Sequence, residues 1–224
     1  MPGRVASFDD AQFKKDASSL IKHDLIQTLI PYYNIAPTHA VPVLLNNGTY
    51  ITAHFGFFPP WAENRKTIHV NARNESIFEK ATFRETYKQN RCIIVINGYY
   101  EWVNSIPYFI HSSNNNYFAI AGIWNEYYDK ELNQNILNIA MITCEPNEKI
   151  AKIHHRMPVI LDKKDYKTWL HNNNINTLNN LFQIYSSELM TYHEVSKNIN
   201  KVGFDNSSCI KECENKLSGQ LSLF

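Results

Sequence analysis

The chain has 224 residues, a formal net charge of +1 at pH 7, a hydrophobic fraction of 44% and an aromatic fraction of 13%. This length suits one globular domain with a sizeable core, and the composition excludes an intrinsically disordered chain. The near-neutral charge excludes a general polycationic coat for nucleic acid, so any nucleic-acid binding has to come from a local patch.

Neither a membrane span nor a secretory signal is expected. No run of about eighteen consecutive apolar residues occurs. Asp9, Asp10, Lys14 and Lys15 interrupt the N-terminal region before an apolar run can form. The chain is therefore predicted to be cytoplasmic.

The cysteines indicate reduced thiols. Two sit in apolar runs and are predicted to be buried, and the other two form a C-x3-C pair with no second pair to complete a zinc site. They are Cys92, Cys144, Cys209 and Cys213. We predict no metal and no cofactor.

Hydrophobic periodicity and turn residues predict the secondary structure. Phe13, Leu20, Ile21 and Leu25 are spaced as on one face of a helix. Asn47-Gly48, between two apolar runs, is typical of a hairpin turn. In chain order we expect a helix over 9–25, strands over 41–45 and 50–55, a loop from 59, a helix over 75–89, a strand over 92–97, a second hairpin over 108–111 and 117–121, a strand over 137–144, and short helices from 146 and over 164–171.

These elements predict an α+β fold with a curved, mainly antiparallel β-sheet and peripheral helices. Strands and helices do not alternate regularly, which disfavours a doubly wound parallel sheet. The expected domain covers residues 1–206, and a flexible tail is expected over 207–224.

The first segment that could carry chemistry is Pro2-Gly3-Arg4. A methionine that precedes a small residue is commonly trimmed, which would leave Pro2 with a free secondary amine. An N-terminal amine has a far lower pKa than a lysine, so part of it is neutral and nucleophilic near pH 7. The alternative is an ordinary frayed terminus.

The second segment is Asn71-Ala72-Arg73-Asn74-Glu75. Asn71 and Arg73 lie two apart and point the same way if the segment is extended. An amide beside a guanidinium can hold a sugar hydroxyl and a phosphate together. The segment also fits a helix N-terminus with Asn74 as its cap, and both interpretations can hold.

The third segment, Gly98-Tyr99-Tyr100-Glu101-Trp102, follows a predicted buried strand. A carboxylate among aromatic residues is costly to bury without a partner. A nearby α-amine would be such a partner and would be oriented by Glu101. The alternative is an exposed glutamate on an edge strand.

The fourth segment is His154-His155-Arg156-Met157-Pro158. A histidine close to an arginine and a proline makes a compact cationic corner that can transfer protons. A metal site is the rival interpretation. We discount it because adjacent histidines point in different directions and no carboxylate or cysteine lies at ligand spacing.

Together, in this order and spacing, these segments closely resemble the SOS-response-associated peptidase (SRAP) family of abasic-site processing proteins. The resemblance covers roughly residues 1–205 and implies that family's fold, with a barrel-like core. Shorter matches support it: Asn34-Ile35-Ala36-Pro37, Gly56 with Pro60-Trp61, and Val195-Ser196.

In that family the residue after the initiator methionine is a cysteine. Its thiol and α-amine capture the aldehyde of an abasic site in single-stranded DNA as a thiazolidine cross-link. By resemblance, Asn71 would position the nucleophile and the sugar, Glu101 would orient the amine and exchange protons with it, and His154 would pass a proton to or from the sugar oxygen. The implied DNA-binding residues are Arg4, Arg73 and Arg156, which would hold the phosphates that flank the lesion, Trp61 and Pro37, which would pack against bases, and Asn34.

This sequence departs from the family at residue 2, which is proline. Because the ring needs sulfur and amine on one residue, the stable cross-link is expected to be lost. A secondary amine can still form an iminium with the aldehyde, as an N-terminal proline does in some DNA glycosylase/lyases. We therefore predict an abasic-site lyase or a reversible abasic-site binder, with Glu101 or His154 as base.

Two other hypotheses stay open. Proline at residue 2, natural or deliberately introduced, could leave an inactive protein that binds abasic single-stranded DNA without reacting. A peptidase is a more distant alternative, because no dedicated protease triad is evident. Because the predicted function is on DNA, we expect the protein to be associated with the nucleoid within the cytoplasm.

The chain ends in Gln220, Leu221, Ser222, Leu223 and Phe224. This pentapeptide resembles the short peptide with which bacterial repair proteins and polymerases dock on the replication sliding clamp. The glutamine would contact the rim of the groove, and Leu223 and Phe224 would fill an apolar pocket. The clamp is thus a predicted partner, and the alternative is an apolar cluster that folds back on the domain.

Overall fold

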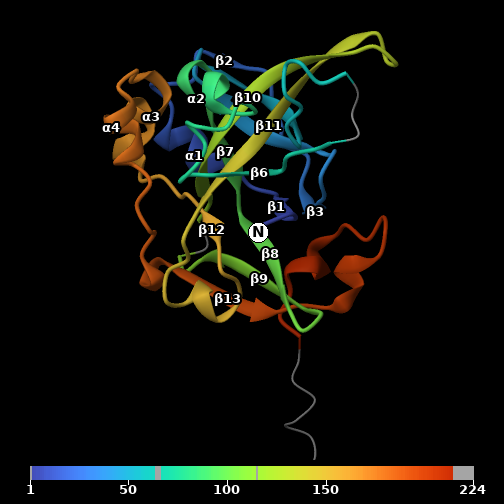
Figure 1. Ribbon diagram of the computed structural model, residues 1–224. Helices are drawn as coiled ribbons and strands as arrows, with labels where there is room; N and C mark the ends of the chain where they lie inside the picture. The colour runs from blue at the N-terminus through green and yellow to red at the C-terminus, as the bar shows by residue number, and fades with distance from the viewer. Residues whose placement is uncertain (1, 64–66, 115, 214–224) are drawn as a thin grey trace, which may run out of the picture.

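A closed β-barrel forms the core of the computed structural model, which describes residues 2–63, 67–114 and 116–213 (Figure 1). Its strands are β4 (Ala40–Leu45), β5 (Thr49–Phe55), β7 (Arg91–Ile96), β10 (Phe118–Asp129) and β11 (Gln134–Cys144). They follow the order β11-β10-β7-β4-β5, with antiparallel neighbours throughout. A parallel pairing of β5 with β11 closes the ring.

The strand β7 lies at the centre of the barrel wall and is buried along its whole length. Its β-branched, apolar run leaves no solvated face, as the sequence predicts. Gly122 lets β10 cross closely over β7, because a Cβ there would lie 2.8 Å from Ile94 Cδ1 and 2.9 Å from Cys92 Sγ. Packing of this kind makes the wall a rigid support for the elements that the barrel carries at one end.

A second, antiparallel sheet lies at that end, below the barrel in Figure 1. Its order is β13-β9-β8-β1-β3. The strands are β1 (Val5–Ser7), β3 (Tyr32–Ile35), β8 (Gly98–Val103), β9 (Ile106–Ser112) and β13 (Met190–Glu194). Because side chains alternate along a strand, Tyr99 joins the main core and Tyr100 joins a smaller apolar cluster on the other face.

Short elements complete the fold. The strand β2 (His23–Asp24) pairs with β5, and both β6 (Asn71–Arg73) and β12 (Met157–Pro158) pair with β11. Short helices lie outside the barrel (Figure 1). They are α1 (Ala11–Asp16), α2 (Arg84–Gln89), α3 (Tyr166–His171) and α4 (Ile175–Asn179), with 3-10 turns η1 (Ile150–Lys152), η2 (Lys163–Asp165), η3 (Ser187–Leu189), η4 (Lys197–Asn200) and η5 (Ser207–Ile210). The predicted barrel-like, mainly antiparallel core with peripheral helices is confirmed.

The first predicted helix is much shorter than expected. It ends at Asp16, and the chain then turns to pair with the β4–β5 hairpin. The carbonyl of Gly48 accepts hydrogen bonds from Lys22 N at 2.8 Å and His23 N at 3.2 Å. This pairing replaces the last helical turns and leaves Leu25 65% exposed, so its assignment to the apolar stripe is wrong.

The predicted hairpin over 108–121 is also wrong. The strand β9 pairs with β8 and β13, whereas β10 pairs with β7 and β11. The actual reversals are tight turns at Asn104-Ser105 and near Asn133, where φ is positive (49°, 64° and 51°). The asparagine-rich link after β9 therefore carries the chain from one sheet to the other.

Two further boundaries need correction. Of the helix predicted over 75–89, only α2 forms, preceded by turns. The tail does not begin at residue 207, because η5 buries Cys209 and the amide of Cys213 donates to Glu194 O at 2.9 Å. The clamp-like pentapeptide at residues 220–224 lies outside the described residues.

The predicted burial of two thiols is confirmed, since Cys92 is 0% and Cys144 is 2% exposed. Among the described residues, no helix has both the length and the apolar character needed to cross a membrane.

Candidate functional site

The N-terminal segment is held in the middle of the second sheet. The strand β1 pairs with both β3 and β8, and Tyr100 N donates to Arg4 O at 2.9 Å. Because β1 and β8 run antiparallel, the residues before β1 continue along β8 toward Glu101. Pro2 is buried there, which rules out the frayed terminus considered above.

Asn71 reaches this segment from the opposite side. The strand β6 is held by its parallel pairing with β11, in which Asn71 lies opposite Met141. The Asn71 Nδ2 group donates to Pro2 O at 2.9 Å. Its Oδ1 atom is buried and accepts no hydrogen bond from the described residues. Asn71 thus orients the backbone of residue 2, and its Oδ1 atom can accept a hydrogen bond from a ligand.

Glu101 and His154 form the titratable part of the site. Glu101 is only 5% exposed, and its Oε1 lies 3.8 Å from His154 Nδ1. Burial raises the pKa of the Glu101 carboxyl, while the charge of His155 opposes that shift. The buried carboxylate rules out an exposed edge-strand glutamate.

The His154 ring is oriented by the backbone that follows it. Its Nδ1 lies 3.0 Å from Arg156 N and 3.2 Å from Arg156 O, so the backbone of the following turn holds the plane of the ring. Burial lowers the pKa of His154, and the charge of Arg156 lowers it further. The ring is therefore mainly neutral near pH 7, and its protonated form gives up a proton readily.

His155, which the sequence analysis treated only as a possible metal ligand, stacks on His154 with ring centroids 4.3 Å apart. It is exposed, and the charge of His154 lowers its pKa. The structure has no cluster of three histidine, cysteine or acidic residues suited to a metal ion in residues 2–63, 67–114 and 116–213. The neighbouring histidines were visible in the sequence, but their stacking was not.

The three arginines of the predicted DNA site differ in their surroundings. Arg73 lies exposed on β6. Arg4 is partly exposed, and one of its nitrogens, Nη1, donates to Asn34 Oδ1 at 3.2 Å and to Ile199 O at 2.6 Å. Arg156 is 8% exposed. The predicted phosphate contacts of all three stay predictions.

Arg156 ties the β6 segment to the corner that carries His154. Its guanidinium forms a forked ion pair with Glu75, with distances of 2.5 and 2.9 Å, and donates to Thr143 O at 2.6 Å and Asn74 Oδ1 at 3.2 Å. Because most of its donors are engaged within the protein, Arg156 holds two parts of the site together. Sequence reasoning missed Glu75 as a partner, although it lies in the same motif as Asn71.

The remaining predicted DNA-binding residues differ in exposure. Asn34 is on β3, where its amide is engaged by Arg4 and by two backbone carbonyls. Pro37 follows it and is half-buried. Trp61 is 58% exposed, at the rim of an open hollow of about 430 Å³ that His69 also lines. A ring displayed in this way is available for stacking.

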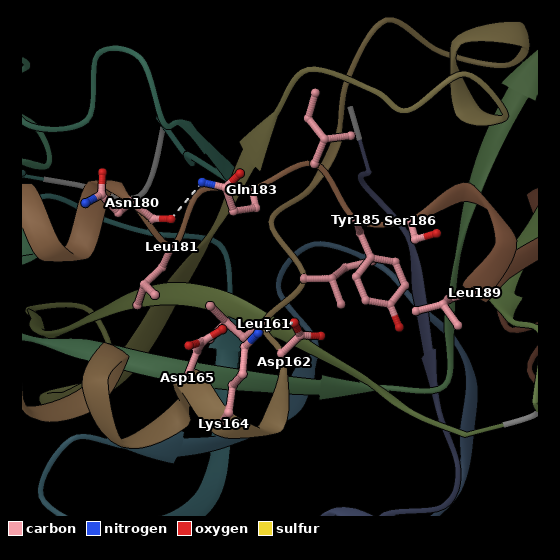
Figure 2. Close-up of a pocket in the computed structure, with 12 residues that line it drawn as sticks. Leu161, Asp162, Lys164, Asp165, Asn180, Leu181, Gln183, Tyr185, Ser186 and Leu189 are labelled. Atoms are coloured by element: carbon pink, nitrogen blue, oxygen red, sulfur yellow. Dashed lines mark hydrogen bonds and ion pairs between the residues drawn. The ribbon is translucent and has the colours of Figure 1, made fainter.

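Another hollow, of about 340 Å³, lies far along the chain from these residues (Figure 2). It is formed by residues 160–165 and 180–189, and its lining includes Asp162, Lys164 and Tyr185. None of the predicted site residues lines it. The constellation of Pro2, Asn71, Glu101 and His154 therefore remains the candidate site.

Comparisons with known proteins identify the family. Residues 1–202 match the protein family described as SOS response associated peptidase (SRAP). The chain is 35% identical over 182 residues to the abasic site processing protein YoqW of Bacillus subtilis, covering 76% of this chain and 81% of that one. It is 33% identical over 199 residues to the abasic site processing protein YoaM of Bacillus subtilis, covering 84% and 87%.

Solved structures share the fold. A protein from Bacteroides thetaiotaomicron superposes with a TM-score of 0.80 at 23% identity, covering 94% of this chain and 100% of that one. A protein from Bordetella bronchiseptica superposes with a TM-score of 0.73 at 18% identity, covering 87% and 99%.

Proposed function

Since the chain belongs to the SOS response associated peptidase (SRAP) family, we propose that it recognises and processes abasic sites in single-stranded DNA, with the amine of residue 2 as nucleophile. The observation that carries the proposal is the hydrogen bond from Asn71 to Pro2 O, next to the Glu101–His154 pair. A nucleophile, an orienting amide, a buried carboxylate and a neutral imidazole converge at one place. Such a combination serves covalent capture of an aldehyde.

The reaction requires removal of Met1, which frees the Pro2 amine. The nitrogen lone pair attacks C1′ of the ring-opened sugar and forms an N–C1′ bond. The former aldehyde oxygen leaves as water, taking one proton from the amine and one from an acid, and a cationic iminium remains. Proline has no thiol, so the intermediate cannot close to a thiazolidine.

The iminium then opens a route to strand cleavage. A base removes a proton from C2′, the C–H electrons form a C1′=C2′ double bond, and the iminium π pair returns to nitrogen, which gives a neutral enamine. The nitrogen lone pair then re-forms the iminium, the C1′=C2′ pair shifts to C2′=C3′, and the 3′ phosphate leaves with the electrons of the C3′–O bond. Water finally hydrolyses the adduct and releases the protein. These steps are β-elimination, and they need one acid and one base in the site.

The surroundings of the two titratable groups support a division of labour. The protonated His154 ring supplies the proton that the departing sugar oxygen needs and is left neutral. Glu101, whose carboxylate lies beside the N-terminal strand, takes the proton from C2′. Asn71 Oδ1, with no partner among the described residues, accepts a hydrogen bond from the sugar hydroxyl. Arg73 and Arg4 contact the flanking phosphates.

Borohydride trapping on single-stranded DNA with one abasic site tests this proposal. Reduction of the iminium gives a stable protein–DNA adduct whose mass maps to residue 2. A family member with cysteine at residue 2 is the positive control, and a Pro2→Leu variant, in which the bulky residue protects Met1 from trimming, is the negative one. A protein that has lost Met1 and binds the DNA but gives no adduct contradicts the covalent route.

The missing sulfur at residue 2 favours a second candidate, a protein that holds abasic single-stranded DNA without reacting and is tethered to the sliding clamp. Intact mass distinguishes the two, because retained Met1 leaves the Pro2 nitrogen in a peptide bond. Deletion of residues 220–224 tests the tether. It is expected to abolish clamp pull-down while the melting temperature stays the same, and a large drop in melting temperature supports packing on the domain instead.

A further inference from the structure

A lobe formed by residues 196–213 covers the outer face of the second sheet. Val195, Ile199 and Cys209 pack there against Ala6, Tyr100 and Phe109 in the smaller apolar cluster. The chain then returns to the edge of β13, where Cys213 N donates to Glu194 O. The lobe is therefore seated on the strands that carry the N-terminal segment and Glu101.

Asn34 connects this lobe to the site. Its Nδ2 group donates to Ile199 O at 3.0 Å and to Phe204 O at 2.6 Å, and its Oδ1 accepts from Arg4 Nη1 at 3.2 Å. Both amide N–H groups and the carbonyl are thus engaged within the protein. An amide in this state has no donor left to offer a DNA phosphate.

Arg4 is held from three sides by these contacts. Its Nη1 also donates to Ile199 O at 2.6 Å, and its guanidinium lies over the Trp102 ring at 5.8 Å from the centroid. Trp102 is itself tied to the lobe, because its Nε1 donates to Asn200 Oδ1 at 3.2 Å. The plane of the guanidinium is therefore fixed by β3, β8 and the lobe together.

The other two nitrogens of the Arg4 guanidinium are unengaged within the described part of the chain. Its Nε and Nη2 atoms make no hydrogen bond to any described residue and are not among the buried polar atoms. Two adjacent N–H groups of an arginine match two oxygens of a phosphate. Because Nη1 is held by the protein, the Nε and Nη2 groups of Arg4 determine the direction from which a phosphate is bound.

We propose that Asn34, anchored by its hydrogen bonds to Ile199 and Phe204 of the lobe, is a positioning residue that orients Arg4 for the phosphate beside the lesion. The inference rests on the proposed function, since it assumes that Arg4 meets a phosphate. An arginine already fixed in its binding rotamer loses less side-chain entropy when the DNA arrives.

The test uses an oligonucleotide with a tetrahydrofuran residue, an abasic analogue without an aldehyde, so that covalent chemistry does not contribute. Fluorescence anisotropy measures affinity between about 50 and 200 mM salt, and the slope of log K against log salt reports phosphate contacts, with about 0.7 per contact for single strands. The variants are Arg4→Ala, Asn34→Ala, the double variant and Asn206→Ala.

Asn206→Ala is the matched control. The Asn206 side chain accepts from Ser208 N and caps η5 in the same lobe, and the substitution changes no charge. It is expected to lower the melting temperature while the slope stays that of the wild type. A general weakening of the lobe is thereby separated from misplacement of Arg4.

We expect Asn34→Ala to weaken binding roughly tenfold and to lower the slope by about 0.7, as Arg4→Ala does, with no further loss in the double variant. If the losses in affinity are additive in the double variant, Asn34 contacts DNA directly. If the slope is unchanged in Asn34→Ala, Asn34 has no part in the phosphate contact. Either result overturns the inference and leaves the proposed function standing. An unchanged slope in Arg4→Ala overturns both the inference and the Arg4 contact of the proposed function.

Should Asn34→Ala not fold, Asn34→Gln takes its place. It keeps the amide donors and acceptor but shifts them by one methylene, so Arg4 is displaced in a folded protein. The same fall in slope is expected, and an unchanged slope contradicts the inference.

Discussion

The Asn71 side chain donates a hydrogen bond to Pro2 O at 2.9 Å, which joins a strand registered on the barrel to the segment that carries the proposed nucleophile. The two residues are far apart in sequence, and each is fixed by its own sheet. Residue 2 therefore has a defined direction before any substrate binds, and such preorganisation is the condition for efficient attack.

Replacing Asn71 by aspartate removes this donor with almost no change of shape. We expect borohydride trapping to slow by roughly tenfold, because a hydrogen bond that orients the nucleophile is worth about 1 kcal/mol or more. Asn74→Asp on the same segment is the matched control for charge, since Asn74 uses its Oδ1 only to accept from Arg156. Equal rates in the two variants contradict an orienting role for Asn71.

Glu101→Gln separates adduct formation from strand cleavage. Glutamine cannot take the proton from C2′, so cleavage is expected to fall by roughly 10²- to 10⁴-fold while the iminium still forms and is trapped. The measurement is the ratio of cleaved strand to trapped adduct over time. If the trapped adduct is lost in parallel with cleavage, Glu101 acts in the formation of the iminium and not in the step that follows it.

The same variant predicts a pH dependence of stability. Burial raises the pKa of Glu101, so between the ordinary glutamate pKa and the raised value the folded protein keeps a proton that the unfolded chain has released. Stability from this group therefore falls as pH rises through that window. The melting temperature of Glu101→Gln minus that of the wild type is expected to increase from acid to neutral pH, and a constant difference contradicts it.

Glu75→Gln tests the ion pair with Arg156. Burial by itself raises the pKa of Glu75, but the hydrogen bonds and charge of Arg156 and the charge of Arg73 outweigh it and lower the pKa. The stabilisation is thus present above the ordinary glutamate pKa and is lost as pH falls through the lowered one. Because Glu75 is half-exposed, we expect a loss of only about 1 kcal/mol at neutral pH.

Denaturant unfolding at neutral and acidic pH measures this effect, with Glu79→Gln as an exposed control on the same segment. The difference between Glu75→Gln and the wild type is expected to vanish in acid. A difference that persists there attributes the loss to packing and not to the ion pair.

Pro2→Cys restores the sulfur that the sequence lacks. With thiol and amine on one residue, the aldehyde can be captured as a thiazolidine, so we expect an adduct that survives denaturation without borohydride. The wild type is expected to give such an adduct only after reduction. If Pro2→Cys gives none once Met1 is removed, the pocket does not present residue 2 to the sugar.

Local patterns predicted much of the barrel wall. The Asn47-Gly48 turn and the apolar run before Asn97 specify a hairpin and a buried strand without help from the rest of the chain. The first helix failed because Lys22 and His23 find backbone partners on Gly48, a tertiary contact that no local periodicity contains. The false hairpin failed for the same reason, since each strand had a better partner elsewhere.

The four segments of the site were recognisable, but their internal contacts were not. The Asn71–Glu75 motif does not reveal that Glu75 binds Arg156, which is distant in sequence and buried, and that Arg73 within the motif is exposed. Asn34 was predicted to touch DNA, whereas its amide is occupied by Arg4 and two carbonyls. Such roles depend on which segments the fold brings together, and that information is distributed over the whole chain.

The pairing of β6 with β11 also determines when the site can exist. Asn71 takes its place only opposite Met141, and His154 follows later still. Contacts of such long sequence separation form late in folding. During synthesis on the ribosome, Pro2 emerges before Asn71, Glu101 and His154, so the proposed site is incomplete until most of the polypeptide has been made.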